Sequence, residues 1–224
     1  MFYSQNFRTA AEINSAMGRV YNHMFLAICT SALVSYIVGS SPALLAFFFT
    51  GIMQWLVIFA PLVAILCFAF AQEKFSKTGL IGFLHGFAAL MGLSMATIFA
   101  VFTMGSIVSA FVGAAVLFAT MSIYGYFTKK SLDSLGQFMF IGLIAIIIAS
   151  IINIFVGSTL MATVISALAI IIFLGLTAYD TQKIREIVSL EVDERAEVIG
   201  ALTLYLDFVN LFINLLQLIG VRRD

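Results

Sequence analysis

The sequence predicts an all-α, polytopic membrane protein with seven transmembrane helices. Hydrophobic residues make up 62% of the 224 positions and charged residues only 10%, and the mean hydropathy is +1.13. Soluble globular chains contain roughly 45–50% apolar and about 25% charged residues. The charged residues are also gathered into short stretches, which leaves long uncharged blocks between them.

The uncharged blocks give the number of helices. Charged residues are absent from 20–72, 78–128 and 134–179. A membrane-spanning helix takes about 20 apolar residues, so each block has room for two helices. A fourth block, 198–221, has room for one and contains Asp207 as its single charged residue.

Turn-forming residues divide each long block near its middle. The three breaks are Gly39-Ser-Ser-Pro42, Thr103-Met-Gly-Ser106 and Gly157-Ser-Thr159. In the first break, we expect Ser41 to cap a helix that begins with Pro42.

The chain is therefore expected to form a single integral-membrane domain over residues 1–224. Residues 1–19 are an N-terminal segment, and 44–49 an interfacial stretch before the second span. The predicted spans are about 20–38, 52–72, 79–101, 106–127, 137–156, 161–182 and 198–221.

The basic residues predict the orientation. All those before position 222 fall on one side, which the positive-inside rule assigns to the cytoplasm together with the N-terminus. Arg222 and Arg223 are the exception. Either the last helix crosses completely and places them outside, or it is re-entrant and both of its ends are cytoplasmic. We favour a complete crossing, because the segment forms about 36 Å of helix at ~1.5 Å per residue.

Several other classes of protein are excluded. Lys and Arg total 11 and balance 11 Asp and Glu, so no basic surplus exists for nucleic acid. Cys29 and Cys67 lie inside apolar runs, where buried thiols rather than disulfides are expected.

The polar stretch 4–19 is followed by no signal-peptide pattern. We expect no cofactor and assign no metal site firmly.

Ionisable residues inside the spans are costly and are therefore candidates for function. His23 is interpreted as an interfacial histidine. His85 lies between Gly82 and Gly86, a GxxxG pattern that lets another helix approach closely. For His85, a packed and hydrogen-bonded imidazole is favoured over a proton relay. The remaining two are Asp180 and Asp207.

The two aspartates are expected to meet. Apolar residues at helical spacing continue the sixth helix to Ser189 as an amphipathic extension, and 191–195 form the natural turn. Asp180 and Asp207 lie nearly equal numbers of residues from Asp193 within that turn. In an antiparallel hairpin they would share one depth.

Two adjacent carboxyl groups away from water cannot both ionise cheaply, so such a pair would share a proton and titrate as a unit. The alternative is two separate carboxylates at a wet funnel, each hydrogen-bonded to neighbouring hydroxyls or amides. The neighbours available for this are Thr177, Tyr179, Asn210 and Asn214.

Three stretches of the chain resemble the Bax inhibitor-1 (transmembrane BAX inhibitor motif) family. They are Ser122-Ile-Tyr-Gly-Tyr-Phe-Thr-Lys-Lys130, Thr177-Ala-Tyr-Asp-Thr-Gln-Lys-Ile184 and Leu204-Tyr-Leu-Asp-Phe-Val-Asn-Leu-Phe212. The resemblance to a bacterial-type member implies an inner-membrane protein whose last helix is central in the bundle. It also implies that Asp180 and Asp207 form a pH-sensing pair. In prokaryotic relatives that pair is linked to a calcium leak, and eukaryotic relatives are tied to suppression of cell death and to calcium release.

One departure from the family pattern concerns the second span. Some bacterial relatives are described as latching one aspartate with an arginine from this helix, but positions 52–72 contain no Arg or Lys. Gln54 or Gln72 could substitute only as neutral partners.

The favoured function is a pH-sensitive leak for Ca²⁺ or another cation, with Asp180 and Asp207 as the pair and His85, Tyr179 and Asn210 as auxiliary polar groups. The alternative is a regulatory protein that binds a membrane protease or another membrane partner. Such a partner could use a glycine-lined face formed by Gly82, Gly86 and Gly113, although packing within the bundle is favoured for these glycines.

An enzyme is not expected. Paired intramembrane aspartates resemble those of aspartyl proteases, but these enzymes carry Gly-x-Gly-Asp where this chain has Leu204-Tyr-Leu-Asp207. A coupled transporter is also disfavoured, because the sequence lacks repeated halves and a pair of interrupted helices.

Overall fold

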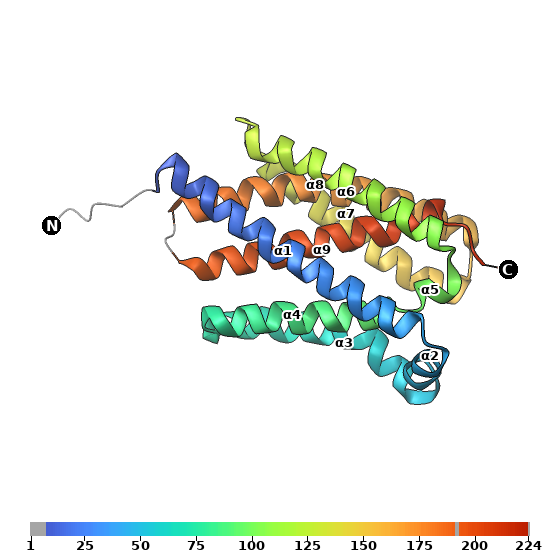
Figure 1. The fold of residues 1–224 in the computed structure, drawn as a ribbon. Coiled ribbons are helices and arrows are strands. Elements are labelled where there is room, and N and C mark those ends of the chain that lie inside the picture. The colour runs from blue at the N-terminus through green and yellow to red at the C-terminus, as the bar shows by residue number, and fades with distance from the viewer. Residues whose placement is uncertain (1–7, 191–192, 224) are drawn as a thin grey trace.

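The computed structural model describes residues 8–190 and 193–223, and it is built from helices joined by short loops (Figure 1). The helices are α1 Ala10–Gly39, α2 Pro42–Phe48, α3 Gly51–Ala71, the 3₁₀ helix η1 Gln72–Lys74, α4 Lys77–Ser94, α5 Ile98–Val101, α6 Met104–Phe127, α7 Asp133–Val156, α8 Thr159–Leu190 and α9 Glu194–Ile219. Among the described residues, 7 helices are long and apolar enough to cross a membrane, with α3 and η1 counted together and α4 continued by α5. The predicted all-α fold with seven spans is confirmed.

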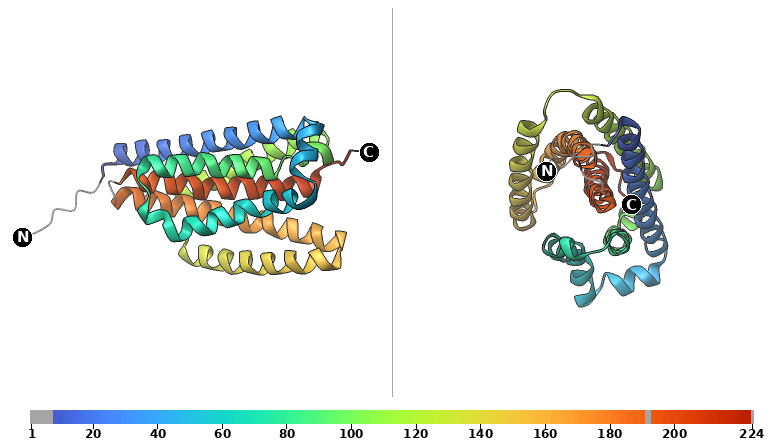
Figure 2. Two further views of the ribbon diagram at one scale, coloured as in Figure 1. Left: turned by 90° about the horizontal axis from the view of Figure 1, so that it is seen from below. Right: turned by 90° about the vertical axis from the view of Figure 1, so that its left-hand side faces the viewer.

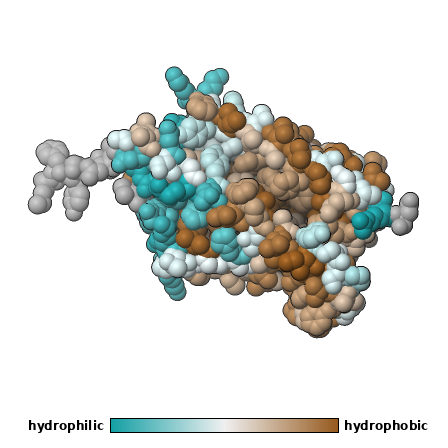
Figure 3. Space-filling model, viewed as in Figure 1, coloured by the Kyte–Doolittle hydropathy of each residue, from teal (hydrophilic) through white to brown (hydrophobic). Residues whose placement is uncertain are grey.

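The bundle has two ends that differ in polarity. We call the end where α8 turns into α9 the hairpin end, and the end where α1 and α9 finish the tail end (Figure 1). Hydrophilic residues gather at the hairpin end, whereas most of the same face toward the tail end is hydrophobic (Figure 3). Helix α9 runs from one end of the bundle to the other, which is the arrangement expected if the last helix crosses the membrane completely.

Local capping explains where several helices begin. Helix α1 starts ahead of the predicted span because Thr9 and Glu12 form a capping box: the Thr9 N–H donates to Glu12 Oε2 at 2.7 Å, and the Glu12 N–H donates to Thr9 Oγ1 at 3.4 Å. Ser41 caps α2 and Pro42 is its first residue, as predicted. The stretch 44–49, expected to be interfacial, is helical at residues 44–48 as part of α2.

The α8–α9 hairpin follows the prediction closely. Helix α8 continues to Leu190, which confirms the extension beyond the sixth span. Within the predicted turn, residues 191–192 lie outside the described part of the chain. Helix α9 begins at Glu194, inside the predicted turn, because the side chain of Asp193 caps it by accepting from the Arg195 N–H at 2.8 Å.

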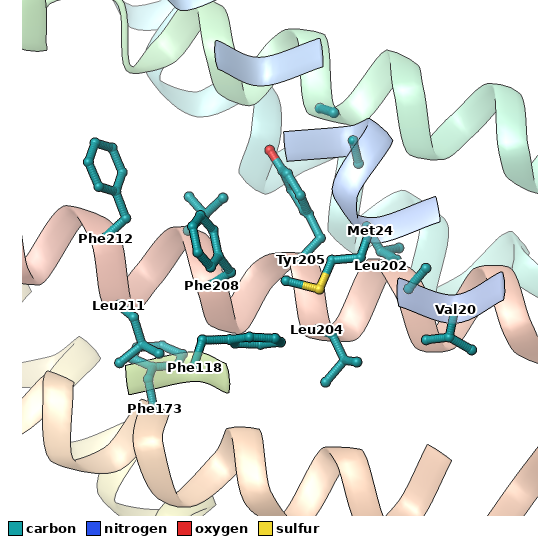
Figure 4. Packing of buried hydrophobic residues seen from close by; sticks show 14 of the residues in the cluster. Val20, Met24, Phe118, Phe173, Leu202, Leu204, Tyr205, Phe208, Leu211 and Phe212 are labelled. Carbon is teal, nitrogen blue, oxygen red and sulfur yellow. The ribbon is translucent and has the colours of Figure 1, made fainter. Parts of the chain in front are cut away.

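Helix α9 is the most deeply buried of the spanning helices. In its apolar window 61% of residues are buried, against at most 33% in any other span. Helices α8, α1, α6 and α4 pack closely on it. Figure 4 shows the large side chains that fill these contacts, among them Tyr205, Phe208 and Phe212 of α9 and Phe118 of α6.

Helices α3 and α7 lie in the outer layer. Helix α7 packs mainly on α8, and Gly136 is its one buried residue in the described chain. Helix α3 packs mainly on α4. The end-on view in Figure 2 shows α7 and the α3–α4 pair on different sides of α8 and α9. The face of α9 between them is therefore less completely covered by helices.

Glycines allow two close helix contacts. A Cβ atom built on Gly92 of α4 would lie 2.4 Å from the carbonyl oxygen of Ser31 in α1, and one on Gly125 of α6 would lie 2.1 Å from that of Ala178 in α8. Only glycine permits these approaches.

The GxxxG pattern at Gly82 and Gly86 does not form a helix contact within the bundle. At Gly82 and Gly86 the space for a Cβ is open to 4 Å, so the expectation that these glycines pack within the bundle is wrong. The helix surface there faces outward because Leu84 and Phe87 supply the buried face of α4. Gly113 does pack within the bundle, against the side chain of Leu215.

Ion pairs hold the hairpin end together. Glu197 in the first turn of α9 is 1% exposed. Its Oε2 accepts from Arg19 Nε at 2.7 Å, and its Oε1 accepts from Arg19 Nη2 at 2.6 Å and from Arg8 Nη1 at 3.3 Å. Lys77 of α4 pairs with Glu194. These contacts attach the start of α9 to α1 and α4.

We expect Gly92→Ala to lower the thermal midpoint of the purified protein by several degrees, because the added methyl group meets backbone and overpacking costs about 1–3 kcal/mol. Gly86→Ala, on the same helix, is the matched control and should leave the midpoint unchanged or slightly raised. Equal midpoints for the two variants would contradict the close α1–α4 contact.

Candidate functional site

A cavity of about 740 Å³ lies among α7, α8 and α9. Its walls are largely apolar, with side chains such as Leu143 of α7 and Phe173 of α8. Its polar lining residues are Gln137, Ser150, Tyr179, Asp180, Thr203, Asp207, Asn210, Asn214 and Gln217. An apolar cavity with a few convergent polar groups is the usual form of a binding or transport site.

Asp180 of α8 and Asp207 of α9 both line this cavity, and their carboxyl groups are neighbours. Asp207 is 4% exposed. A hydrogen bond between two carboxyl groups needs a proton on one of them, because an ionised carboxylate can only accept. If both groups were ionised, two negative charges would face each other away from water. The geometry therefore favours one proton held between the two.

The alternative arrangement, in which each carboxylate is bonded separately to hydroxyls or amides, is not what the described residues form. The hydroxyl of Thr177 and the side-chain amides of Asn210 and Asn214 donate to backbone carbonyls of their own helices, at 2.7, 2.8 and 2.9 Å. Tyr179 makes no bond to either aspartate among these residues. Oδ2 of Asp207 is buried without a hydrogen-bond partner in the described chain.

The polar residues of α9 in the cavity form one stripe along the helix. Thr203, Asp207, Asn210, Asn214 and Gln217 are separated by three or four residues, so they share a face. The stripe rises about 21 Å at ~1.5 Å per residue, against a hydrocarbon core of about 30 Å. At its tail-end limit, the hydroxyl of Ser166 donates to the Gln217 side chain at 2.9 Å.

Tyr179 lies where the cavity approaches the hairpin end. It lines both the cavity and a second hollow of about 440 Å³, whose walls carry charged residues including Lys129 and Asp133. The Tyr179 ring packs against Gly136, where a Cβ would meet ring atoms at 2.5 Å. Tyr179 thus separates a charged surface hollow from the cavity that contains the aspartates.

The segment around Asp180 makes a different contact at each position. The backbone of Ala178 meets Gly125, the ring of Tyr179 meets Gly136, and Asp180 meets Asp207. The hydroxyl of Thr181 is 3.0 Å from that of Ser122, which is 2.7 Å from the Tyr21 hydroxyl. Segments 122–130 and 177–184, quoted above for their resemblance, therefore contact each other directly.

Other predicted residues lie elsewhere. His85 is on α4, outside the cavity lining, and its Nδ1 is 3.0 Å from the hydroxyl of Thr30, as expected of a packed imidazole. His23 is half-buried on α1. Neither Gln54 nor Gln72 lines the cavity, so neither substitutes for a basic latch on the aspartates. Of the predicted residues, Asp180, Asp207, Tyr179 and Asn210 line the cavity and His85 does not.

Two polar residues, Glu197 and Gln217, were not predicted from the sequence. Glu197 is in the charged run before the last predicted span, which suggested a solvated turn, yet it is buried. It lies in line with the buried positions Ala201 and Leu204, and this spacing could have revealed it. Gln217 was not predicted because only polar residues close to the two aspartates in sequence were considered, although Gln217 continues the spacing of Asp207, Asn210 and Asn214.

The site offers few ligands for a metal ion. Within residues 8–190 and 193–223, no group of three or more His, Cys, Asp or Glu side chains could hold one. Two carboxyl groups and several amides and hydroxyls can interact with a passing cation, whereas tight Ca²⁺ sites provide six to eight oxygen ligands.

The fold and the site define a multi-pass membrane protein with an acidic pair in a cavity between its last three spans. The family model described as "Inhibitor of apoptosis-promoting Bax1" matches residues 13–224. The chain belongs to this family, the Bax inhibitor-1 family, as its motifs indicated.

Three relatives from different bacteria match over nearly their full lengths. The inner membrane protein YbhL of Escherichia coli strain K12 is 35% identical over 221 residues, 95% of this chain and 94% of its own. An uncharacterized protein of Borreliella burgdorferi is 34% identical over 217 residues, 94% of each chain. The uncharacterized protein YrjE of Lactococcus lactis is 34% identical over 224 residues, 93% of this chain and 92% of its own.

Replacing one carboxyl group of the pair should change how stability depends on pH. If both wild-type carboxyl groups ionise in alkaline buffer, they repel each other, so Asp207→Asn should raise the thermal midpoint relative to the wild type by about 4 °C more than in mildly acidic buffer. The measurement is thermal unfolding in detergent at both pH values. Glu73→Gln, which removes an exposed carboxylate at the hairpin end, is the control. A pH-independent difference for Asp207→Asn would show that the groups do not interact.

Proposed function

We propose that this protein is a pH-sensitive leak path for Ca²⁺ or another cation, in which Asp180 and Asp207 sense the proton. The observation that carries this proposal is the pairing of the two carboxyl groups on the wall of a cavity that also holds a polar stripe. Loss of the shared proton adds negative charge to the cavity and removes a bond between α8 and α9. Both changes bias the packing of the two helices and the attraction for a cation.

The shape of the cavity supports passage along α9. The stripe from Thr203 to Gln217 covers about two-thirds of a typical hydrocarbon core. Polar groups of this kind replace part of an ion's hydration shell, whereas apolar constrictions exclude water. Tyr179 would restrict the path toward the hairpin end, and the Ser166–Gln217 bond would restrict it toward the tail end.

We further propose that the protein lies in the inner membrane with its N-terminus in the cytoplasm. YbhL is described as an inner membrane protein. All basic residues before position 222 belong to segments that meet at or near the hairpin end, which is the arrangement the positive-inside rule gives for a cytoplasmic hairpin end. Protease accessibility of tags placed at each end of the chain, in membrane vesicles of known orientation, would test this arrangement.

A catalytic role is not part of the proposal. Intramembrane aspartyl proteases carry Gly-x-Gly-Asp at the second aspartate, whereas this chain has Leu204-Tyr-Leu-Asp207. Leu204 and Tyr205 are both 0% exposed and pack in the core. The Tyr205 hydroxyl is bonded to Ser31 Oγ at 2.6 Å, which fixes the ring in the core.

A regulatory role through a membrane partner is the second candidate. The observation that favours it is the open surface at Gly82 and Gly86, where another helix could approach closely. A partner retained by the wild type in mild detergent and lost from a Gly82→Leu/Gly86→Leu variant, with no ion flux from the purified protein, would favour this function over the leak.

The leak is tested with purified protein in vesicles that contain a Ca²⁺ indicator. Wild-type flux should change with pH, and Asp180→Asn and Asp207→Asn should each flatten that dependence, because a neutral amide cannot release the proton. Glu73→Gln should retain the wild-type profile. A wild-type pH profile in both aspartate variants would reject the sensing role.

The path is tested by closing the stripe away from the aspartates. Asn214→Leu should reduce flux roughly tenfold at every pH while leaving the form of the pH profile intact, because an apolar side chain narrows and dries the path. Asn22→Leu makes the same replacement at an exposed site on α1 and is the control. Unchanged flux in Asn214→Leu would place the path elsewhere.

A further inference from the structure

An apolar slot of about 330 Å³ lies in the tail-end half of the bundle, separate from the cavity with the aspartates. Helices α1 and α6 form its sides, and α5 and the residue Met95 close it toward the tail end. Phe208, Val209 and Phe212 of α9 contribute to its floor. At its mouth, Tyr36 is 52% and Val108 55% exposed on the lipid-facing surface. The slot therefore opens toward the bilayer.

A single buried hydroxyl marks the tail-end part of the slot. Ser35 of α1 lines it, is 3% exposed, and has no hydrogen-bond partner for its Oγ among the described residues. Ser31, one turn earlier, also lines the slot but donates to the Ala27 and Ala88 carbonyls. A buried hydroxyl is normally satisfied. Ser35 thus indicates an occupant that brings a hydrogen-bond acceptor.

Another hollow, of about 410 Å³, adjoins the slot at the tail end, and we call it the tail-end hollow. The residues that the two share are Tyr36, Phe99, Met104 and Ile107. The walls of the tail-end hollow also carry Ser40 and Arg223. It therefore places a cation beyond the apolar slot.

The backbone holds Arg223 in this position. Its N–H donates to the Val101 carbonyl at 2.8 Å, and the Thr103 N–H donates to the Val221 carbonyl at 3.0 Å. Residues Phe102 and Arg222 form an antiparallel bridge between these bonds. The C-terminal tail is thereby fixed beside α5 and α6, with Arg223 and not Arg222 lining the hollow.

We propose that the slot and the adjoining hollow together bind one glycerophospholipid from the leaflet at the tail end. One acyl chain fills the slot, an ester carbonyl accepts the hydrogen bond of Ser35, and the phosphate pairs with Arg223. The order of these groups along the site, apolar, then hydroxyl, then cation, matches the order of acyl chain, ester and phosphate in such a lipid. Arginine is well suited to bind phosphate.

This assignment also gives a reason for Arg223. Arg222 and Arg223 are the basic residues that the positive-inside rule leaves unexplained, since the other turns at the tail end carry none. The bound chain would contact the face of α9 formed by Phe208 and Phe212, whereas the aspartate cavity lies on another face. The inference does not depend on the proposed leak.

Native mass spectrometry of the delipidated full-length protein with dioleoylphosphatidylglycerol tests the assignment. The wild type should retain one lipid. Arg223→Gln should lower retention about tenfold and Ser35→Ala roughly fivefold, from loss of a charged and a neutral hydrogen bond respectively. Ala32→Phe, which places a ring in the slot, should abolish retention.

Matched controls separate this site from general lipid or anion binding. Arg222→Gln removes the neighbouring charge, and Ala145→Phe adds the same bulk on the exposed side of α7; both should retain lipid as the wild type does. Dioleoylglycerol lacks the phosphate and should bind to the wild type more weakly than the phospholipid does. The Arg223→Gln variant should bind the two lipids equally. Inorganic phosphate alone should not be retained.

Three results would overturn the proposal: absence of a discrete one-lipid complex, equal losses in Arg222→Gln and Arg223→Gln, or retention of inorganic phosphate without lipid. Thermal unfolding of each variant identifies damaged folds. If Ala32→Phe is unfolded, the comparison of the two arginine variants decides the outcome.

Discussion

Two neighbouring carboxyl groups inside a helical bundle are the main electrostatic constraint on this fold. Ionisation of both Asp180 and Asp207 would place like charges face to face away from water. In the function we propose, this repulsion couples the packing of α8 and α9 to the proton concentration. The cavity on whose wall they lie links the same two helices to a polar stripe. The aspartate pair, the packing of α8 on α9 and the cavity therefore depend on one another.

The rest of the fold keeps the pair and its cavity in place. Helix α9 is buried along most of its length, and Glu197 with Arg8 and Arg19 fixes its start at the hairpin end. At the tail end, the paired backbone of residues 101–103 and 221–223 fixes the chain beyond it. The outer helix α7 makes fewer contacts with the core, which leaves the cavity between it and α9. A helix held at both ends beside such a cavity can respond to charge without loss of the fold.

Much of this could be predicted from the sequence, and the reasons are physical. Lipid excludes charge, so the uncharged blocks gave the spans, and the symmetry of the last hairpin brought Asp180 and Asp207 to one depth. Three-dimensional packing could not be derived in the same way. The GxxxG pattern at Gly82 and Gly86 indicated a close contact, yet that contact is made at Gly92, because the direction a helix face takes depends on its neighbours. Glu197 was missed because a charged run reads as a solvated turn unless its partners are known.

Infrared spectroscopy of the carboxyl groups across a pH titration tests the central claim most directly. A protonated carboxyl band from the pair should persist after the exposed carboxylates have ionised, and it should shift or disappear in both Asp180→Asn and Asp207→Asn. Two independent carboxyl signals, each unaffected by replacement of the other aspartate, would contradict it.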